Sequence, residues 1–254
     1  MLEQTQKDYL NYFGLGEPQK QKSSEEHLRL FSVLCSELAG RIDAEPYLPR
    51  YKDIREDIQG KGGCPLSDIA DVSRPASRYK TNYVDDIKFG LPMMNGRQIA
   101  QYRAIALRSM SLSAFKRPEL FALEKGMTLV TADGRAEENL ADCALVSNDR
   151  VGWCASGHVH RVRPRQGINA GLVYLACASP PVQAQLKALA TGSVVDGLSE
   201  SDVASVIVPY DDSAELVEIG SRAEIAWRMF AEASESEDRA IDRLEHEFDR
   251  DFVI

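Results

Sequence analysis

Residues 181–209, with the sequence PVQAQLKALATGSVVDGLSESDVASVIVP, join a helical pattern to a strand-like pattern. Val182, Leu186 and Leu189 recur on one face of a helix that prolines introduce and Gly192 ends. Residues 203–209 are rich in valine and isoleucine, which is typical of a short buried strand. A helix, a polar glycine loop and a strand in succession indicate a domain that mixes α and β structure.

The region before this stretch predicts further short strands separated by turn residues. Residues 89–94 form an apolar run that stops at Asn95-Gly96, and residues 127–131 form another that stops at Asp133-Gly134. Residues 171–178 fit either the end of a strand or the start of a helix. We therefore predict a mixed α/β (α+β) domain with a curved mixed sheet over residues 64–210, with a helical turn running into a strand at 65–72 and strands at 144–146, 151–154 and 158–162.

The first 63 residues predict a helical lead-in to this domain. Ser23 and Glu26 have the spacing of a capping box at the start of a helix over residues 23–40, and a short helix is expected at 50–58. With 254 residues, 44% of them hydrophobic, the chain is long enough for one large domain, or for a medium domain with a helical attachment.

Residues 211–254 predict a long C-terminal spacer helix with one apolar seam. Residues 213–250 contain no proline and a single glycine, and the apolar residues follow one another at steps of three and four. Such a helix needs another helix to cover its seam, so we predict pairing with a helix of another molecule; folding back on its own domain or on the helix expected at 23–40 is the alternative. The predicted subunit interface consists of Leu216, Ile219, Ala223, Ala226, Phe230, Ala233 and Leu244.

The net charge of −9 is distributed unevenly along the chain. Residues 211–254 carry 14 acidic and 5 basic side chains, whereas residues 64–210 carry 14 acidic and 16 basic ones. Within residues 74–117, nine basic side chains stand against two acidic ones, and residues 150–165 hold four arginines and no acid. The acidic average therefore does not exclude a nucleic-acid partner, because phosphate binding depends on where lysine and arginine gather.

Signatures of cofactor binding and membrane insertion are missing from the sequence. It has neither a phosphate-binding G-x-x-x-x-G-K-[ST] loop nor a G-x-S-x-G nucleophile elbow. Residues 179–182 (SPPV) lack both the Asn or Asp and the aromatic residue of the tetrad of amino-methyltransferases. No apolar run approaches 18 residues, no secretory signal pattern opens the chain, and the five cysteines are scattered. We therefore expect no cofactor, no membrane association and a cytoplasmic location.

Cys143, Cys154, His158 and His160 are the candidate metal ligands. Their spacing, C-x10-C-x3-H-x-H, does not match the common structural zinc patterns. We interpret the two cysteines as small buried hydrophobic residues and predict no metal site, although a small zinc-dependent enzyme is an alternative.

The basic stretches contain side chains of the kinds that bind DNA. Asn95, Arg97 and Gln98 combine two amides with a guanidinium, and arginine reads guanine while Asn or Gln reads adenine. On a strand, residues 158 and 160 would share one face and residues 161 and 163 the other, while the loop at 191–193 can offer N–H groups to phosphate. The candidate DNA-binding residues are Arg74, Arg78, Lys80, Asn95, Arg97, Gln98, Arg103, His158, Arg161, Arg163, Thr191, Gly192 and Ser193.

Several motifs stand in a specific order along the chain. They are RIDAEPY at 41–47, PLSDIADV at 65–72, GLPMMNGRQI at 90–99, LEKGMTLV at 123–130, SGHVHRVRP at 156–164, GLVYL at 171–175, TGSVVDGLSESD at 191–202 and VIVP at 206–209. In this order they resemble a target recognition domain of the specificity subunit of type I restriction-modification systems. Residues 213–250 stand where that family has its spacer helix.

The resemblance implies a non-catalytic subunit that recognises a sequence in double-stranded DNA. A separate adenine methyltransferase subunit would dock on the helices and flip the target base, and a motor-nuclease restriction subunit can join the complex. Members of the family usually carry two recognition domains and two spacer helices, whereas this chain has one of each, and Met127 replaces the usual acid of the strand entry. The resemblance therefore implies a half-subunit that works as a homodimer. The alternative function is a protein-interaction scaffold derived from such a domain.

Overall fold

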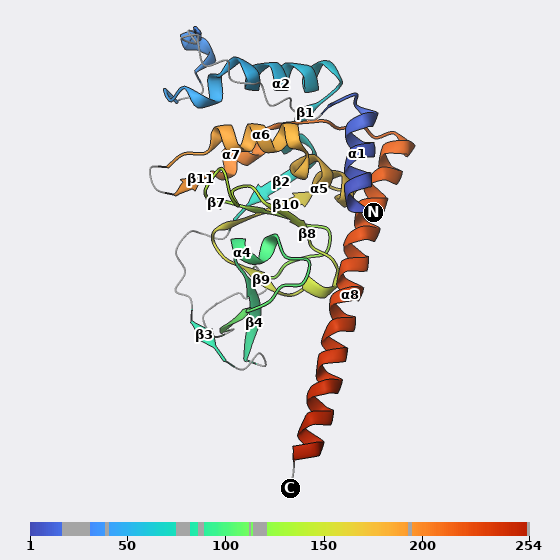
Figure 1. The fold of residues 1–254 in the computed structure, drawn as a ribbon. Helices are drawn as coiled ribbons and strands as arrows, with labels where there is room; N and C mark the ends of the chain where they lie inside the picture. The colour runs from blue at the N-terminus through green and yellow to red at the C-terminus, as the bar shows by residue number, and fades with distance from the viewer. Residues whose placement is uncertain are drawn as a thin grey trace, which may run out of the picture.

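The computed structural model describes residues 1–16, 31–38, 41–74, 82–85, 89–111, 113, 121–192 and 195–252, with side chains described as far as residue 248. Its helices are α1 Leu2–Tyr12, α2 Pro49–Gly60, α3 Leu66–Ile69, α4 Gly96–Ile99, α5 Ala170–Ala178, α6 Pro180–Leu189, α7 Glu200–Ser205 and α8 Ala214–Phe252 (Figure 1). Its strands are β1 Cys64–Pro65, β2 Ala70–Ser73, β3 Tyr83–Val84, β4 Gly90–Met94, β5 Arg108–Ser111, β6 Thr128–Thr131, β7 Asp133–Gly134, β8 Cys143–Leu145, β9 Cys154–Ala155, β10 Val159–Pro164, β11 Asp196–Gly197 and β12 Ile207–Val208.

Two four-stranded sheets form the centre of the molecule. The central sheet has the strand order β2-β10-β6-β8 and is antiparallel throughout. The second sheet has the order β3-β5-β4-β9, in which β4 and β9 run parallel. Two short antiparallel pairs join β1 to β12 and β7 to β11. The predicted mixed α/β fold is confirmed, although its strands form separate sheets.

Helix α5 occupies the middle of the core, between the central sheet and α8. Seven of its nine residues are buried, as expected of a helix that is apolar on every side. Its contact with α8 depends on two glycines, because a Cβ added at Gly171 would lie 1.9 Å from the carbonyl oxygen of Gly220. The core is therefore closed by α8, which lies along one side of the domain (Figure 1).

The N-terminal helix α1 packs into the same core. Tyr9, Leu10 and Phe13 are buried members of the main apolar cluster. The Tyr9 hydroxyl donates a hydrogen bond to the carbonyl of Pro209, and burial raises the pKa of this phenol well above its ordinary value. Residues at both ends of the chain thus cover the same side of the domain.

Several local predictions can be compared with the structure. The helix expected at 50–58 is confirmed as α2, and the ambiguous segment 171–178 is helical. The helix predicted over 23–40 is wrong for residues 31–38, where Cys35–Glu37 form only a single 3₁₀ turn; its remaining residues lie outside the described part. The strand predicted at 203–209 is shorter, because α7 continues to Ser205 and only Ile207–Val208 pair.

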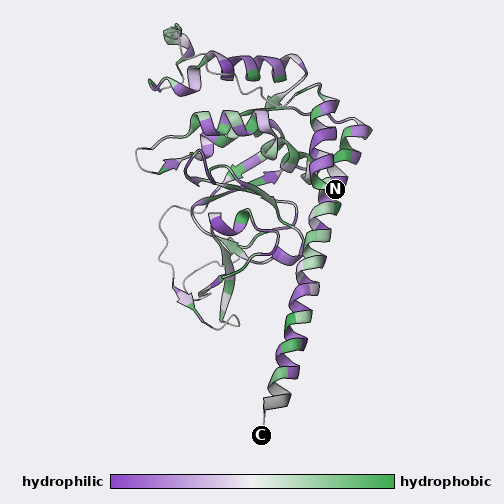
Figure 2. Cartoon of the chain, viewed as in Figure 1, coloured by the Kyte–Doolittle hydropathy of each residue, from purple (hydrophilic) through white to green (hydrophobic). Residues whose placement is uncertain are grey.

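The predicted long C-terminal helix is confirmed as α8, whose 39 residues span about 58 Å at 1.5 Å per residue. Its first half lies against the domain and its second half projects beyond it (Figure 1). Hydrophilic and hydrophobic residues alternate along the projecting half (Figure 2). In the part of the chain that the structure describes, none of the helices has the length and apolar character needed to cross a membrane.

Candidate nucleic-acid interface

Some of the candidate DNA-binding residues gather at one end of the central sheet. Arg74 directly follows β2, and His158 directly precedes β10. Because the strands are antiparallel, the start of β10 meets the ends of β6 and β2 there, with Val159 paired to Thr131 and Arg161 to Ser73. We call the surface at this end the His158 surface; it consists of Arg74, Asn95, Arg97, His158, Thr191 and Gly192.

Asn95 and Arg97 belong to this surface because α4 packs against the end of β6. A Cβ added at Gly96 would lie 2.9 Å from Thr131 Cγ2, so the close approach of α4 depends on glycine. The predicted Asn95-Gly96 turn is instead the start of this short helix. Arg97 is exposed, and within the described part of the chain it forms no ion pair.

The loop that follows α6 is joined to His158 through the small β7–β11 pair. The Asp133 carboxylate contacts Nδ1 of His158, and Asp133 is the register partner of Gly197. Gly197 in turn exchanges two backbone hydrogen bonds with Thr191, at 2.9 and 2.8 Å. Thr191 is therefore linked to His158 through Gly197 and Asp133, although more than thirty residues separate the two in the sequence.

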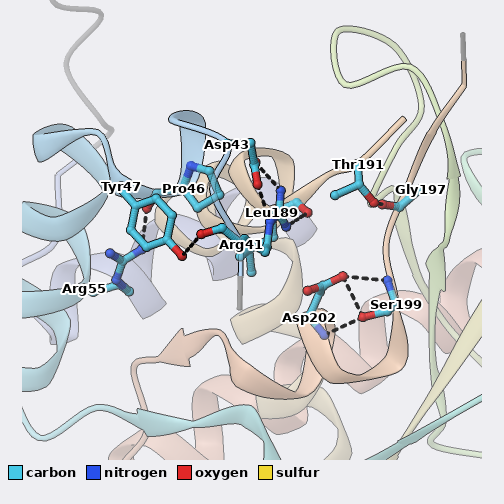
Figure 3. Close-up of polar contacts among 10 residues, drawn as sticks. All are labelled: Arg41, Asp43, Pro46, Tyr47, Arg55, Leu189, Thr191, Gly197, Ser199 and Asp202. Carbon is cyan, nitrogen blue, oxygen red and sulfur yellow. Dashed lines mark hydrogen bonds and ion pairs between the residues drawn. The ribbon is translucent and has the colours of Figure 1, made fainter. Parts of the chain in front are cut away.

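The lead-in segment anchors the start of this loop (Figure 3). Arg41 donates from Nη1 to the carbonyl oxygen of Leu189, the last residue of α6, at 2.5 Å. The same guanidinium pairs with Asp43 and lowers the pKa of that carboxyl. On the far side of the loop, Ser199 and Asp202 form the capping box that begins α7. Both ends of the loop are thus held by side chains.

For two of the predicted DNA-binding residues the prediction is corrected, because their side chains are buried. Arg161 is 5% exposed and donates from Nη2 to the carbonyl of Ala155 at 3.0 Å. Gln98 is 6% exposed, and its Oε1 accepts a hydrogen bond from the backbone N–H of Asn95 at 3.1 Å. Both side chains stabilise the fold and are inaccessible to a base or a phosphate.

Two further arginines are exposed in part but lie away from the His158 surface. Arg103 pairs with Asp238 and Glu237 on α8, and these acids raise its pKa. Arg163 is at the opposite end of β10 from His158 and pairs with Glu124 at 2.8 Å. The structure therefore does not bring either residue to the predicted site. Arg78, Lys80 and Ser193 lie outside the described residues.

Acidic side chains at the His158 surface were missed by sequence reasoning. Asp133 contacts His158, and Glu200 accepts a hydrogen bond from the backbone N–H of Arg74 at 2.6 Å. In the sequence, Asp133 is recognisable only as a residue that ends a strand, and Glu200 only as a residue that begins a helix. Their partners are 25 and 126 residues away, so no local signal identifies them.

His160 is buried inside the sheet and is separate from exposed His158. Its Nε2 donates to the carbonyl of Leu198 at 2.9 Å. Burial lowers the pKa of His160, and nearby Arg74 acts in the same direction. The imidazole is therefore neutral in the folded protein at neutral pH.

This pKa difference predicts a loss of stability in acid. Because the folded-state pKa of His160 lies below the unfolded value, its contribution is present above about pH 6.5 and is lost as the pH falls through the folded-state pKa. Between about pH 7 and pH 5, we expect the wild-type protein to lose more unfolding free energy than His160→Gln, which keeps an N–H donor but takes up no proton. Urea denaturation at each pH measures the loss, and equal losses in both proteins would contradict the prediction.

The predicted subunit interface on α8 also needs correction. Leu216, Ile219, Ala223 and Ala226 are buried against the domain of their own chain, so they are not available to a second copy. Phe230 is half-buried and packs against Trp227 at a ring separation of 5.6 Å. Of the predicted interface, Ala233 and Leu244 remain exposed on the projecting half, where Ile241 and Phe248 are exposed as well.

The candidate metal ligands are dispersed. Cys143 is in β8 of the central sheet and Cys154 is in β9 of the second sheet. Among the described residues, no three histidine, cysteine or acidic side chains stand close enough to hold a metal ion. Burial raises the pKa of Cys154 to about 11, in keeping with its role as a small core residue.

The chain was compared with protein families, curated proteins and solved structures. No family model and no curated protein matches it. Among solved structures, 27 chains match. One is the S subunit of a type I restriction-modification system from M. genitalium, with 14% identity, a TM-score of 0.45, and coverage of 63% of this chain and 37% of that one.

Two other matches are of related kinds. The HsdS subunit from Thermoanaerobacter tengcongensis has 13% identity and a TM-score of 0.45, over 76% of this chain and 46% of that one. The type IIG restriction endonuclease BpuSI has 10% identity and a TM-score of 0.49, over 71% of this chain and 28% of that one. This chain therefore spans less than half the length of each of the three proteins.

Proposed function

We propose that this chain is a non-catalytic subunit that recognises a short sequence in double-stranded DNA. The observation that carries the proposal is the His158 surface, where segments from four parts of the chain bring arginine, histidine and amide side chains and an exposed loop together. Arg97, exposed and without an ion pair in the described part, is the residue best suited to contact a base edge. Thr191 and Gly192 supply the backbone and hydroxyl groups that suit phosphate.

Binding by the chain alone is expected to be weak and sensitive to salt. Asp133 and Glu200 offset part of the positive charge at the His158 surface, and the whole chain carries a net charge of −9. Few phosphates can then be neutralised, and affinity that depends on phosphate contacts falls steeply as salt displaces them. A partner subunit is therefore part of the proposal.

The proposed partners are an adenine methyltransferase subunit and a second copy of this chain in a cytoplasmic complex, which a motor-nuclease restriction subunit can join. The sequence resemblance suggests these partners, and the projecting half of α8 offers the surface. Residues 235–248 carry six acidic and two basic side chains, and Ile241, Leu244 and Phe248 are exposed among them. The homodimer is thus proposed through these distal residues instead of the buried part of the seam.

Replacement of Arg97 by alanine tests the proposal. We expect the variant to lose about 1–3 kcal/mol of discrimination between its preferred duplex and a scrambled one, because a guanidinium that reads a base edge would be missing. Fluorescence anisotropy with both duplexes at low and moderate salt measures the change. Arg228→Ala is the matched control, since Arg228 is an exposed arginine that pairs with Glu232 on α8 and is not part of the His158 surface.

The same experiment separates DNA recognition from the scaffold function. A scaffold would keep its partners and its assembly state in both Arg97→Ala and Arg163→Ala, and would show no sequence preference in the wild-type protein. If wild type and Arg97→Ala bind every duplex alike, the proposed recognition function is wrong.

A further inference from the structure

The segment after α4 is fastened to the long helix α8 by polar contacts. The Tyr102 hydroxyl donates to Oε1 of Glu237 at 3.0 Å, and its ring lies 6.3 Å from that of Phe230. Arg103 pairs with Asp238 and lies 3.5 Å from Glu237. The two hydrogen bonds join residues 135 positions apart, and from residue 235 to residue 248 the side chains of α8 are exposed.

A buried arginine holds the same segment from inside the protein. Arg150 is 1% exposed, and its Nη2 donates to the carbonyl oxygens of Gln101 and Tyr102 at 2.7 and 3.0 Å. Its guanidinium lies over the ring of Trp227 on α8, 5.3 Å from the centroid. One cation thus connects the backbone after α4 to an aromatic residue of α8.

The fastened segment continues directly into the proposed reading residues. Gln98 donates from Nε2 to the carbonyl of Ile105 at 3.3 Å, while the N–H of Ile105 donates to Oε1 of Gln101 at 3.0 Å. Residues 98–105 therefore form a closed loop that begins next to Arg97. Helix α4 has only four residues, so its orientation depends on such neighbouring contacts.

We propose that Tyr102, Arg103 and Arg150 are positioning residues, which transmit the orientation of α8 to Arg97 and so set the DNA selectivity of the chain. The proposal rests on the proposed function, because it concerns how the reading surface is held. In this proposal, Glu237 and Asp238 contact the reading segment, residues 95–105, of their own chain. They do so in addition to forming part of the surface offered to a partner. A subunit that moves the projecting half of α8 would thereby move the reading segment.

A charge-reversal pair tests this connection in the full-length chain. Arg103→Glu and Asp238→Arg are made singly and together, and hydrogen exchange of the amides of residues 95–105 is measured. We expect each single variant to speed exchange about fivefold, because an ion pair becomes a repulsive contact, and the double variant to return toward the wild-type rate. The control is Arg228→Glu with Glu232→Arg, an exposed pair within α8 that leaves the reading segment untouched.

DNA selectivity is measured on the same variants by selection from a pool of duplexes with a randomised core. We expect the single variants to enrich a weaker or altered motif and the double variant to recover the wild-type motif. Unchanged exchange in residues 95–105, or a double variant that stays as fast as the singles, would overturn the positioning role. Altered exchange with an unaltered motif would overturn it too. A wild-type protein that enriches no motif instead refutes the proposed function, whatever the exchange rates show.

Discussion

Replacement of Gly171 by alanine is expected to lower the free energy of unfolding by about 3 kcal/mol or more, the upper range for overpacking a core. The added Cβ would lie 1.9 Å from the carbonyl oxygen and 2.7 Å from the carbonyl carbon of Gly220. Both obstacles are backbone atoms of α8, so relief requires that α5 and α8 move apart. The interface between them includes Leu172, Ala223 and Trp227, whose packing would loosen as well.

Urea denaturation followed by circular dichroism measures this loss. Gly157→Ala is the matched control, because a Cβ there would meet no atom within 4 Å and its φ is not in the left-handed region. We expect the control to change stability by no more than about 0.5 kcal/mol. Equal stability of Gly171→Ala and Gly157→Ala would show that α5 and α8 do not approach as closely as described.

Replacement of Arg150 by methionine is expected to cost about 3 kcal/mol of unfolding free energy. Methionine fills much of the volume but leaves the carbonyls of Gln101 and Tyr102 without their donor and removes the cation over Trp227. Burial lowers the pKa of the Arg150 guanidinium while the Asp149 carboxylate, 3.6 Å away, opposes the shift. The Arg150 side chain is a buried cation bound by two backbone carbonyl oxygens. Its removal leaves those oxygens without a hydrogen-bond donor.

Arg135→Met provides the comparison, because the Arg135 side chain is exposed and its ion pair is of the surface kind. We expect that variant to stay within about 0.5 kcal/mol of the wild-type protein. In a Trp153→Phe background, which leaves Trp227 as the sole tryptophan, fluorescence reports the same site, since loss of the overlying cation changes the surroundings of that ring. A stable Arg150→Met protein with unchanged Trp227 emission would contradict the role assigned to Arg150.

The sequence alone predicts the helices and strands whose signals lie within a few neighbouring residues. Apolar spacing identifies α6 and α8, and the prolines and the glycine that flank α6 place its limits within a few residues. Residues 171–178 stayed ambiguous, because a helix buried on every side has no polar face and therefore no period to detect. The division of the strands into two sheets depends on long-range pairing, such as β4 with β9, which no local pattern encodes.

The candidate site was predictable only in part, because burial and ion pairing are tertiary properties. The sequence groups Arg97 with Gln98 and His158 with Arg161, yet the fold exposes the first of each pair and buries the second. Arg103 has no acidic residue near it in the sequence, because its ion-pair partners Glu237 and Asp238 follow 134 and 135 residues later. A run of basic residues thus indicates a binding surface without specifying which members face it.

The apolar seam of α8 was likewise predictable only in part. Its spacing correctly indicates that a partner helix is needed, and it does not identify that partner. In the structure, α5 and α1 of the same chain cover Leu216, Ile219 and Ala223, which was the alternative to intermolecular pairing. On the projecting half, Leu244 and Phe248 remain exposed.

The central claim is that the His158 surface recognises a DNA sequence, and selection from a randomised duplex pool at low salt tests it most directly. Repeated rounds with the full-length chain enrich a preferred site even when each binding event is weak. We expect the wild-type protein to enrich one short motif and Arg97→Ala to lose the preference at a position of that motif, while Arg228→Ala keeps it. A final pool as random as one carried through without protein would contradict the claim.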